Sequence, residues 1–169
     1  RAGYDVIWSD VDIHWEKDPL PGLLEDVRRT KADIAIQSDA PVGQHPTSNI
    51  NSGFYYVVRS NQTIAAFEEM VHHASLHPEL SEQRSFDKVL CGGKNKVAER
   101  LCLDENNTTS TYVLDPDVYI NGDYENKFQD LGEVNIIHFN WRVGLTKKTE
   151  GFKKRGKWRL DENTGSCTL

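Results

Sequence analysis

The 169-residue chain has 20 Lys and Arg residues against 26 Asp and Glu residues, a formal net charge of −6 at pH 7. This excess of acidic residues argues against a nucleic-acid-binding protein, which would have a basic face. No apolar run reaches the roughly 20 residues that span a bilayer, and the chain opens into a strand pattern rather than a signal peptide. Its length suits one domain with its own core. We expect a domain over residues 1–160 and a loose tail over residues 161–169.

The first predicted strand covers residues 4–8 and leads into an acidic motif. Its apolar, β-branched and aromatic residues predict a strand buried on both faces. Asp10 and Asp12 follow, and carboxylates two residues apart on an extended segment point to the same side. Burying such a pair is costly unless its charge is compensated, and the pair suits a hard divalent cation. The alternative is that one Asp caps a turn and the other faces water.

The next elements place further polar residues at strand ends. Residues 20–30 form a predicted helix after the helix-breaking pair Asp18-Pro19. Residues 32–36 form a short strand that Asp39 follows. Residues 51–59 form a central strand, in which Asn51 and Gly53 precede the apolar run. Glycine lets the backbone approach a ligand and asparagine offers both a donor and an acceptor for sugar hydroxyls, although a simple turn is the alternative.

Two helices are predicted in the middle of the chain, over residues 62–75 and 81–90, with caps at Ser60 or Asn61 and at Ser81. The first carries His72, His73 and His77. Adjacent histidines on a helix point about 100° apart, so we expect no metal site there. Residues 92–111 are polar and predicted to form a loop. N-glycosylation acceptors occur at Asn61, Asn106 and Asn107.

The chain contains three cysteines. Cys91 and Cys102 are close enough in sequence to form a disulfide, which would leave Cys167 in the tail. Spacing alone does not settle the connectivity.

The last part of the chain ends in a strand and a short helix. Residues 111–114 predict a small strand, and turns are expected at residues 114–116 and at Asn121-Gly122. Residues 134–138 form the last clear strand, with His138 at its end. On its own, this histidine would be a core residue bonded to the backbone. A short terminal helix is expected around Phe152, ending at Gly156, with Trp158 packed on it.

The order of these motifs resembles a known family. Asp10-Val11-Asp12 and Asp18-Pro19 are followed by Asn51-Ser52-Gly53, and His138-Phe139-Asn140 is followed by Gly144 and Lys147. This order is similar to the nucleotide-diphospho-sugar transferase domain of glycosyltransferase family 77, a relative of family 8, from residue 4 to about residue 158. Glu82 and Asp87 replace the Asp and Asn of the family pattern D-Q-x-x-h-N, in which h is apolar.

The resemblance implies an α/β, GT-A-like domain with a mixed sheet flanked by helices. Such folds begin with a βαβ half that holds the nucleotide base, so we expect this chain to be truncated at that half. The implied activity is that of a retaining, metal-dependent glycosyltransferase, which moves a sugar from a UDP-sugar to a glycan or glycoprotein acceptor. The full-length protein would be a type II membrane protein of the Golgi lumen, held in the membrane by a segment absent from this chain.

The resemblance also assigns roles to individual residues. They are metal ligands (Asp10, Asp12, His138), diphosphate contacts (Lys147, Lys148, Gly144), donor-sugar contacts (Asp39, Asn51, Ser52, Gly53) and catalytic residues facing the sugars (Glu82, Gln83). The metal would be Mn²⁺ or Mg²⁺, and a mixture of oxygen and nitrogen ligands suits manganese better than calcium. A lysine would meet the diphosphate as a point charge.

Two other functions fit parts of the sequence. Because half of the donor site is expected to be missing, the chain could be a non-catalytic glycan- or nucleotide-sugar-binding protein, and the fragment itself could be inactive. A haloacid-dehalogenase-like phosphatase also has a strand that ends in D-x-D, where the first Asp is the nucleophile. This chain has His14 in place of the usual threonine two residues after the second Asp.

Overall fold

The computed structural model describes residues 3–92 and 96–167. Its strands are β1 (Val6–Ser9), β2 (Ile13–Trp15), β3 (Ile34–Ser38), β4 (Ile50–Val57), β5 (Lys96–Ala98), β6 (Leu101–Leu103), β7 (Ser110–Val113), β8 (Tyr119–Ile120) and β9 (Ile136–His138). Its α-helices are α1 (Leu20–Thr30), α2 (Asn61–Leu76), α3 (Glu82–Cys91), α4 (Gly122–Lys127) and α5 (Leu145–Lys154), and a 3₁₀ turn covers Pro46–Ser48.

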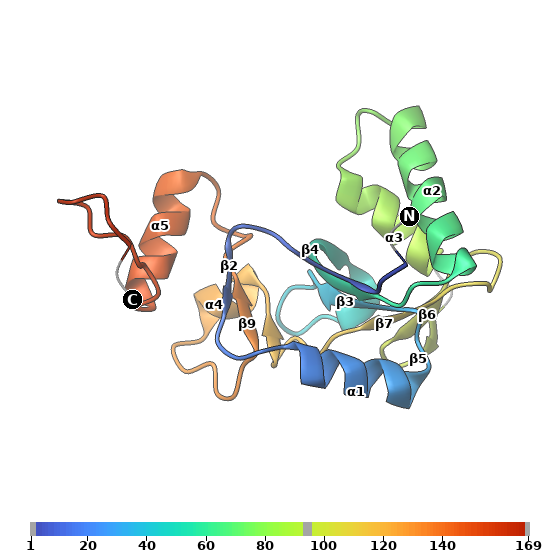
Figure 1. The fold of residues 1–169 in the computed structure, drawn as a ribbon, viewed down its shortest axis with the longest axis horizontal. Coiled ribbons are helices and arrows are strands. Elements are labelled where there is room, and N and C mark those ends of the chain that lie inside the picture. Colours follow the sequence, from blue (N-terminus) through green and yellow to red (C-terminus); the bar gives the residue numbers. More distant parts are fainter. Residues whose placement is uncertain (1–2, 93–95, 168–169) are drawn as a thin grey trace.

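The strands form two mixed sheets joined by the acidic motif (Figure 1). The larger sheet has the order β1-β4-β3-β7-β6-β5 and the smaller has the order β2-β9-β8. The β3–β7 and β8–β9 pairs are parallel, and the other pairs are antiparallel. Residues 10–12 connect β1 in one sheet to β2 in the other. The predicted α/β fold with a mixed sheet flanked by helices is confirmed.

Helices cover both faces of the larger sheet (Figure 1). α2 and α3 bury Met70 and Leu90 against Ile36 of β3, while α1 buries Leu23 on the opposite face against Phe54 of β4. Both faces of β3 and β4 are therefore apolar, because alternate side chains of a strand point to opposite faces. The predicted central position of β4 is confirmed, since it pairs with both β1 and β3.

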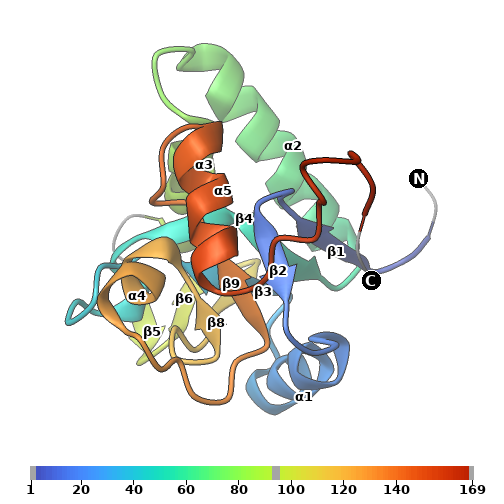
Figure 2. The ribbon, with the colours of Figure 1, turned by 90° about the vertical axis from the view of Figure 1, so that its left-hand side faces the viewer.

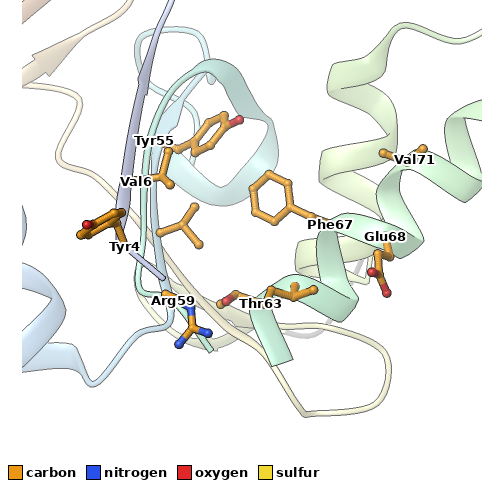
Figure 3. Close-up of a pocket in the computed structure, with 10 residues that line it drawn as sticks. Tyr4, Val6, Tyr55, Arg59, Thr63, Phe67, Glu68 and Val71 are labelled. Carbon is orange, nitrogen blue, oxygen red and sulfur yellow. The ribbon is translucent and has the colours of Figure 1, made fainter. Parts of the chain in front are cut away.

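The expectation that the first strand is buried on both faces is wrong. β1 lies at the edge of the larger sheet, and Val6 and Trp8 are 49% and 50% exposed. Val6 pairs with Val57 of β4 and Trp8 pairs with Tyr55. Val6, Tyr55 and Val57 line a groove of about 560 Å³ between β1 and α2. Apolar side chains from β1, β4 and α2 line it (Figure 3). An apolar sequence pattern does not distinguish an edge strand with such a groove from an interior strand.

The structure confirms three predicted helices and shows a side-chain cap at the start of one of them. α1 spans the predicted residues 20–30. α2 begins after Ser60, whose hydroxyl accepts a hydrogen bond from the backbone N–H of Thr63, while the Thr63 hydroxyl accepts one from the backbone N–H of Ser60. This reciprocal pair is a capping box. α3 also begins after Ser81, as predicted, but the Ser81 side chain makes no capping hydrogen bond.

Three local predictions are corrected. Part of the polar stretch 92–111 pairs as β5 and β6 instead of forming a loop, because β6 finds a partner in β7. Asn121 is not in a simple turn but caps α4, since its Oδ1 accepts from the N–H groups of Asp123 and Tyr124. The terminal helix begins at Leu145, earlier than expected, after Gly144 with a φ of 86°.

The C-terminal part of the chain covers the smaller sheet. Viewed from that end, α5 stands in front of β9 (Figure 2). Phe152 of α5 packs on Phe139 with ring centroids 4.2 Å apart, and Trp158 packs edge-on against Phe152, as predicted. The tail returns through a bridge between Leu160 and Cys167.

Cys91 and Cys102 form a disulfide, with Cα atoms 5.1 Å apart, and Cys167 is free and exposed. The bond links the end of α3 to β6. In the described part of the chain, every helix is too short or too polar to cross a membrane.

Candidate metal and sugar site

The acidic motif and His138 meet where the two sheets join. The backbone N–H of Asp10 donates to the carbonyl of Gly53 at 2.7 Å, which fixes the motif to β4. The N–H of Phe139 donates to the carbonyl of Asp12 at 3.1 Å, and Ile13 pairs with His138 across β2 and β9. Main-chain pairing thus brings residues more than 120 positions apart in sequence to one point.

One side-chain atom from each of Asp10, Asp12 and His138 lies within 4.8 Å of the others. Nε2 of His138 is 3.3 Å from Oδ1 of Asp12 and 3.8 Å from Oδ2 of Asp10. His138 and Asp12 are only 2% and 7% exposed, whereas Asp10 lies at the surface. Among the described residues this is the one group of three or more such ligands that converges. His72, His73 and His77 are not among its members.

Gln37 orients the imidazole of His138. It is fully buried, and its Nε2 donates to the carbonyls of Tyr119 and Ile120 at 3.2 and 3.0 Å. Carbonyls accept only, so the other amide atom, Oε1, faces Nδ1 of His138 at 2.8 Å. Nδ1 therefore carries the proton, and in a neutral imidazole the lone pair of Nε2 faces the two aspartates. Three electron-pair donors aimed at one point form a fitting cation site.

Neighbouring cationic groups stabilise the charged form of the Asp12 carboxylate. Burial of the carboxyl raises its pKa, but the contacts with His138, when the imidazole is protonated, and with Lys148 outweigh this and hold the pKa well below its usual value. The Lys148 ammonium contacts Oδ2 of Asp12. Lys148 lies on the first turn of α5, so the packing of this helix on the smaller sheet brings a cation to the acidic motif.

Gly53 allows the site to close. A Cβ at this position would lie 2.5 Å from Cε1 of His138, 2.6 Å from Oδ2 of Asp10 and 2.9 Å from Oδ1 of Asn51. No side chain fits between these atoms. The backbone of Gly53 therefore approaches the site closely, as predicted, because the side chains of Asp10 and His138 occupy the space that a Cβ would need.

A cleft of about 450 Å³ opens beside the aspartates. It is lined by Asp10, Asp39, Asn51, Ser52, Gly53, Glu82, Gln83, His138, Asn140, Trp141 and Val143. Ser52 and Glu82 interact at its wall, with Oγ and Oε1 3.4 Å apart. The structure thus brings the predicted sugar-facing residues, from α3, from β4 and from just after β3, to a cleft that Asp10 and His138 also line.

The other predicted residues lie around this cleft or away from it. Lys148 contacts Asp12, whereas Lys147 is exposed, and neither lysine is among the residues that line the cleft. Gly144 precedes α5, where its positive φ favours glycine. The glycosylation acceptors Asn61, Asn106 and Asn107 are all exposed and outside the cleft.

Three site residues were missed from the sequence: Gln37, Asn140 and Trp141. Gln37 had a signal, because a polar residue directly after the apolar run 34–36 demands a buried partner. The sequence around Trp141 gives no signal of a role in the site, since an aromatic residue in a loop is equally consistent with core packing.

Known proteins that are similar in sequence to this chain include glycosyltransferases. The family profile described as nucleotide-diphospho-sugar transferase matches residues 1–152. The chain is 33% identical to beta-arabinofuranosyltransferase RAY1 of Arabidopsis thaliana, over 99% of this chain and 33% of that protein. It is 24% identical to UDP-galactose:fucoside alpha-3-galactosyltransferase of Dictyostelium discoideum, over 96% of this chain and 26% of that protein.

A third relative is UDP-D-xylose:L-fucose alpha-1,3-D-xylosyltransferase MGP4 of Arabidopsis thaliana, with 23% identity over 100% of this chain and 49% of that protein. The chain thus spans between a quarter and half the length of these relatives. No solved structure shows a significant match. The fold and the site define a protein of the nucleotide-sugar transferase class. The chain belongs to the nucleotide-diphospho-sugar transferase family, consistent with the resemblance to glycosyltransferase family 77.

Proposed function

We propose that the full-length protein is a retaining, manganese-dependent glycosyltransferase that moves a sugar from a UDP-sugar to a glycan or glycoprotein acceptor. The observation that carries this proposal is the convergence of Asp10, Asp12 and His138. Two carboxylates with an imidazole nitrogen suit a borderline ion such as Mn²⁺ better than Ca²⁺, and Mg²⁺ is the second choice. When bound, the ion would supply a positive charge that neutralises the leaving diphosphate.

The chain's own residues support the rest of the reaction. Lys148 adds a positive charge beside Asp12, where the diphosphate would lie, and Lys147 is the weaker candidate because it is exposed. Asn51, Ser52 and Gly53 line the cleft with Asp39, where the donor sugar would lie. Glu82 and Gln83 of α3 form the facing wall, on the acceptor side. Retention of configuration rests on the resemblance to family 77.

The relatives suggest which donor sugars and which acceptors to use as probes in an assay. Their names state three transferred groups, which are arabinofuranosyl, galactosyl and xylosyl, and two of the names give a fucoside or L-fucose as the acceptor. The Cys91–Cys102 disulfide supports a Golgi lumenal location, since such bonds persist in oxidising compartments.

The test uses the full-length protein with UDP-galactose, UDP-xylose and UDP-arabinofuranose. We expect Mn²⁺-dependent release of UDP, and transfer to methyl fucoside, from at least one donor. Asp12→Asn should lose at least about 100-fold in rate, because it removes a charged ligand. Binding of UDP-sugar without turnover would instead make the protein a binder, and equal activity with excess chelator would contradict metal dependence.

A further inference from the structure

Trp141 and Val143 are the apolar side chains among the mostly polar residues that line the cleft, and Trp141 is the larger of the two. Trp141 is 43% exposed, although it lies only three residues after the buried strand β9. We propose that Trp141 is a platform on which a sugar ring stacks during the transfer reaction. This inference rests on the proposed function and adds a specificity-determining residue to it.

The polar edge of the indole is fixed by Asp39. Nε1 of Trp141 donates to Oδ1 of Asp39 at 3.1 Å. The same carboxylate accepts from side-chain amides of four other residues, which are Asn49, Asn51, Gln83 and Asn140. A carboxylate offers about four lone-pair sites, so five donors saturate it. Asp39 is therefore a positioning residue that orients the cleft's donors and holds the indole by its edge.

The backbone under Trp141 is fixed as well. A Cβ on Gly122 would lie 2.5 Å from the Trp141 backbone nitrogen, so the loop rests directly on the start of α4. The next residue, Arg142, pairs with the fully buried carboxylate of Glu125 at 2.8 Å. The ring is thus held in place before any ligand binds, and less conformational entropy is lost on stacking.

A sugar ring matches this arrangement. It has a face of C–H groups and a rim of hydroxyls, so one face can cover an aromatic ring while the rim needs hydrogen-bond partners. The cleft places the indole beside the polar side chains of Asp10, Ser52 and Glu82. Sites for small ligands combine apolar and aromatic walls with a few polar groups in this way. The sugar is either that of the donor or that of the acceptor.

The experiment compares Trp141→Ala and Trp141→Phe with Trp15→Ala in the full-length protein. Trp15 is a matched control because it is also 43% exposed but lies outside the cleft. Each variant is titrated with UDP and with the active UDP-sugar in the presence of Mn²⁺, and the KM for methyl fucoside is measured. The UDP titration reports the metal and diphosphate site separately from the sugar.

If the donor sugar stacks, Trp141→Ala binds UDP like the wild type but binds the UDP-sugar up to about tenfold more weakly. If the acceptor stacks, UDP-sugar affinity is unchanged and the acceptor KM rises by a similar factor. Trp141→Phe keeps an aromatic face and retains most of the affinity in either case, and Trp15→Ala changes neither.

Two results overturn the inference while leaving the proposed function intact: an active wild type with an unaffected Trp141→Ala variant, or an equal loss of UDP and UDP-sugar binding, which indicates a structural role. A wild type without UDP-sugar binding or transfer would overturn the proposed function and this inference together.

Discussion

Oε1 of Gln37 accepts a hydrogen bond from Nδ1 of His138 at 2.8 Å, and both side chains are almost completely buried. This contact joins β3 of the larger sheet to β9 of the smaller sheet. It fixes the tautomer that turns the lone pair of Nε2 toward Asp10 and Asp12. A residue that never touches the metal would therefore decide whether His138 can bind it.

Replacing Gln37 tests this relationship. Gln37→Leu should weaken Mn²⁺ binding about 10- to 100-fold, as is typical when the hydrogen-bond partner of a ligating histidine is removed. Gln37→Glu should weaken it less, because a carboxylate still accepts from Nδ1. Calorimetric titration measures the affinity, and thermal melting of each variant measures stability. A lower melting temperature with unchanged Mn²⁺ affinity would show that Gln37 only supports the fold.

Gly53→Ala should abolish Mn²⁺ binding. The added methyl group would lie 2.5–2.6 Å from atoms of His138 and Asp10, so both ligands must move apart. Ser52→Ala is the control, because it makes a neighbouring change on β4 away from the ligand atoms. Wild-type affinity for Mn²⁺ in Gly53→Ala would mean that the metal lies elsewhere.

Lys148→Ala and Lys147→Ala form a matched pair on the first turn of α5. Removing Lys148 should weaken UDP binding about tenfold or more, since a hydrogen bond to a charged group contributes roughly 1.5–3 kcal/mol. Removing the exposed Lys147 should change the affinity for UDP less than about twofold, because solvent screens the charge of an exposed side chain. Titration with UDP at saturating Mn²⁺ measures both. Equal losses would assign the diphosphate contact to both lysines.

Asp5 makes a pH-dependent contribution to stability. Its carboxylate accepts hydrogen bonds from the backbone N–H of Arg59 at 2.8 Å and from the hydroxyl of Tyr56 at 2.7 Å. These bonds lower its pKa below the ordinary 3.8. A lowered pKa means that this contribution is complete above pH 3.8 and is lost as the pH falls through the folded-state value.

Asp5→Asn should therefore lower the free energy of unfolding at pH 7, by about 1 kcal/mol at most because solvent screens this exposed group. The difference from the wild type should shrink below pH 3.8. Urea unfolding at several pH values measures it. A difference that stays constant from pH 7 to pH 2.5 would exclude the charge as its cause.

The sequence singled out Asp10 and Asp12 because they follow an apolar strand, whereas the metal role of His138 came only from the family resemblance; the structure brings the three side chains together. The sequence also predicted α1 and α2 closely, since their apolar spacing and caps are local features. Both kinds of prediction depend on signals contained within a few residues.

The errors have a common physical cause, which is that pairing partners distant in the chain decide the outcome. The sequence of β1 is typical of an interior strand, yet β1 pairs with β4 on one side only and therefore lies at the edge of the sheet. β6 lies in a polar stretch and becomes a strand because β7 pairs with it. Gln37 and His138 are 101 residues apart in the sequence. The residues next to each of them therefore do not indicate that the two side chains meet.

The Cys91–Cys102 bond has a consequence for how the protein is produced. α3 carries Glu82 and Gln83 at its first turn, and the disulfide ties its last residue to β6. Closing a loop of this size stabilises a fold by about 3 kcal/mol. In the reducing cytosol of a bacterial host the bond would not persist, and one wall of the sugar cleft would lose its covalent anchor. A secretory host, or a strain with an oxidising cytosol, is therefore the suitable source for every measurement of sugar binding.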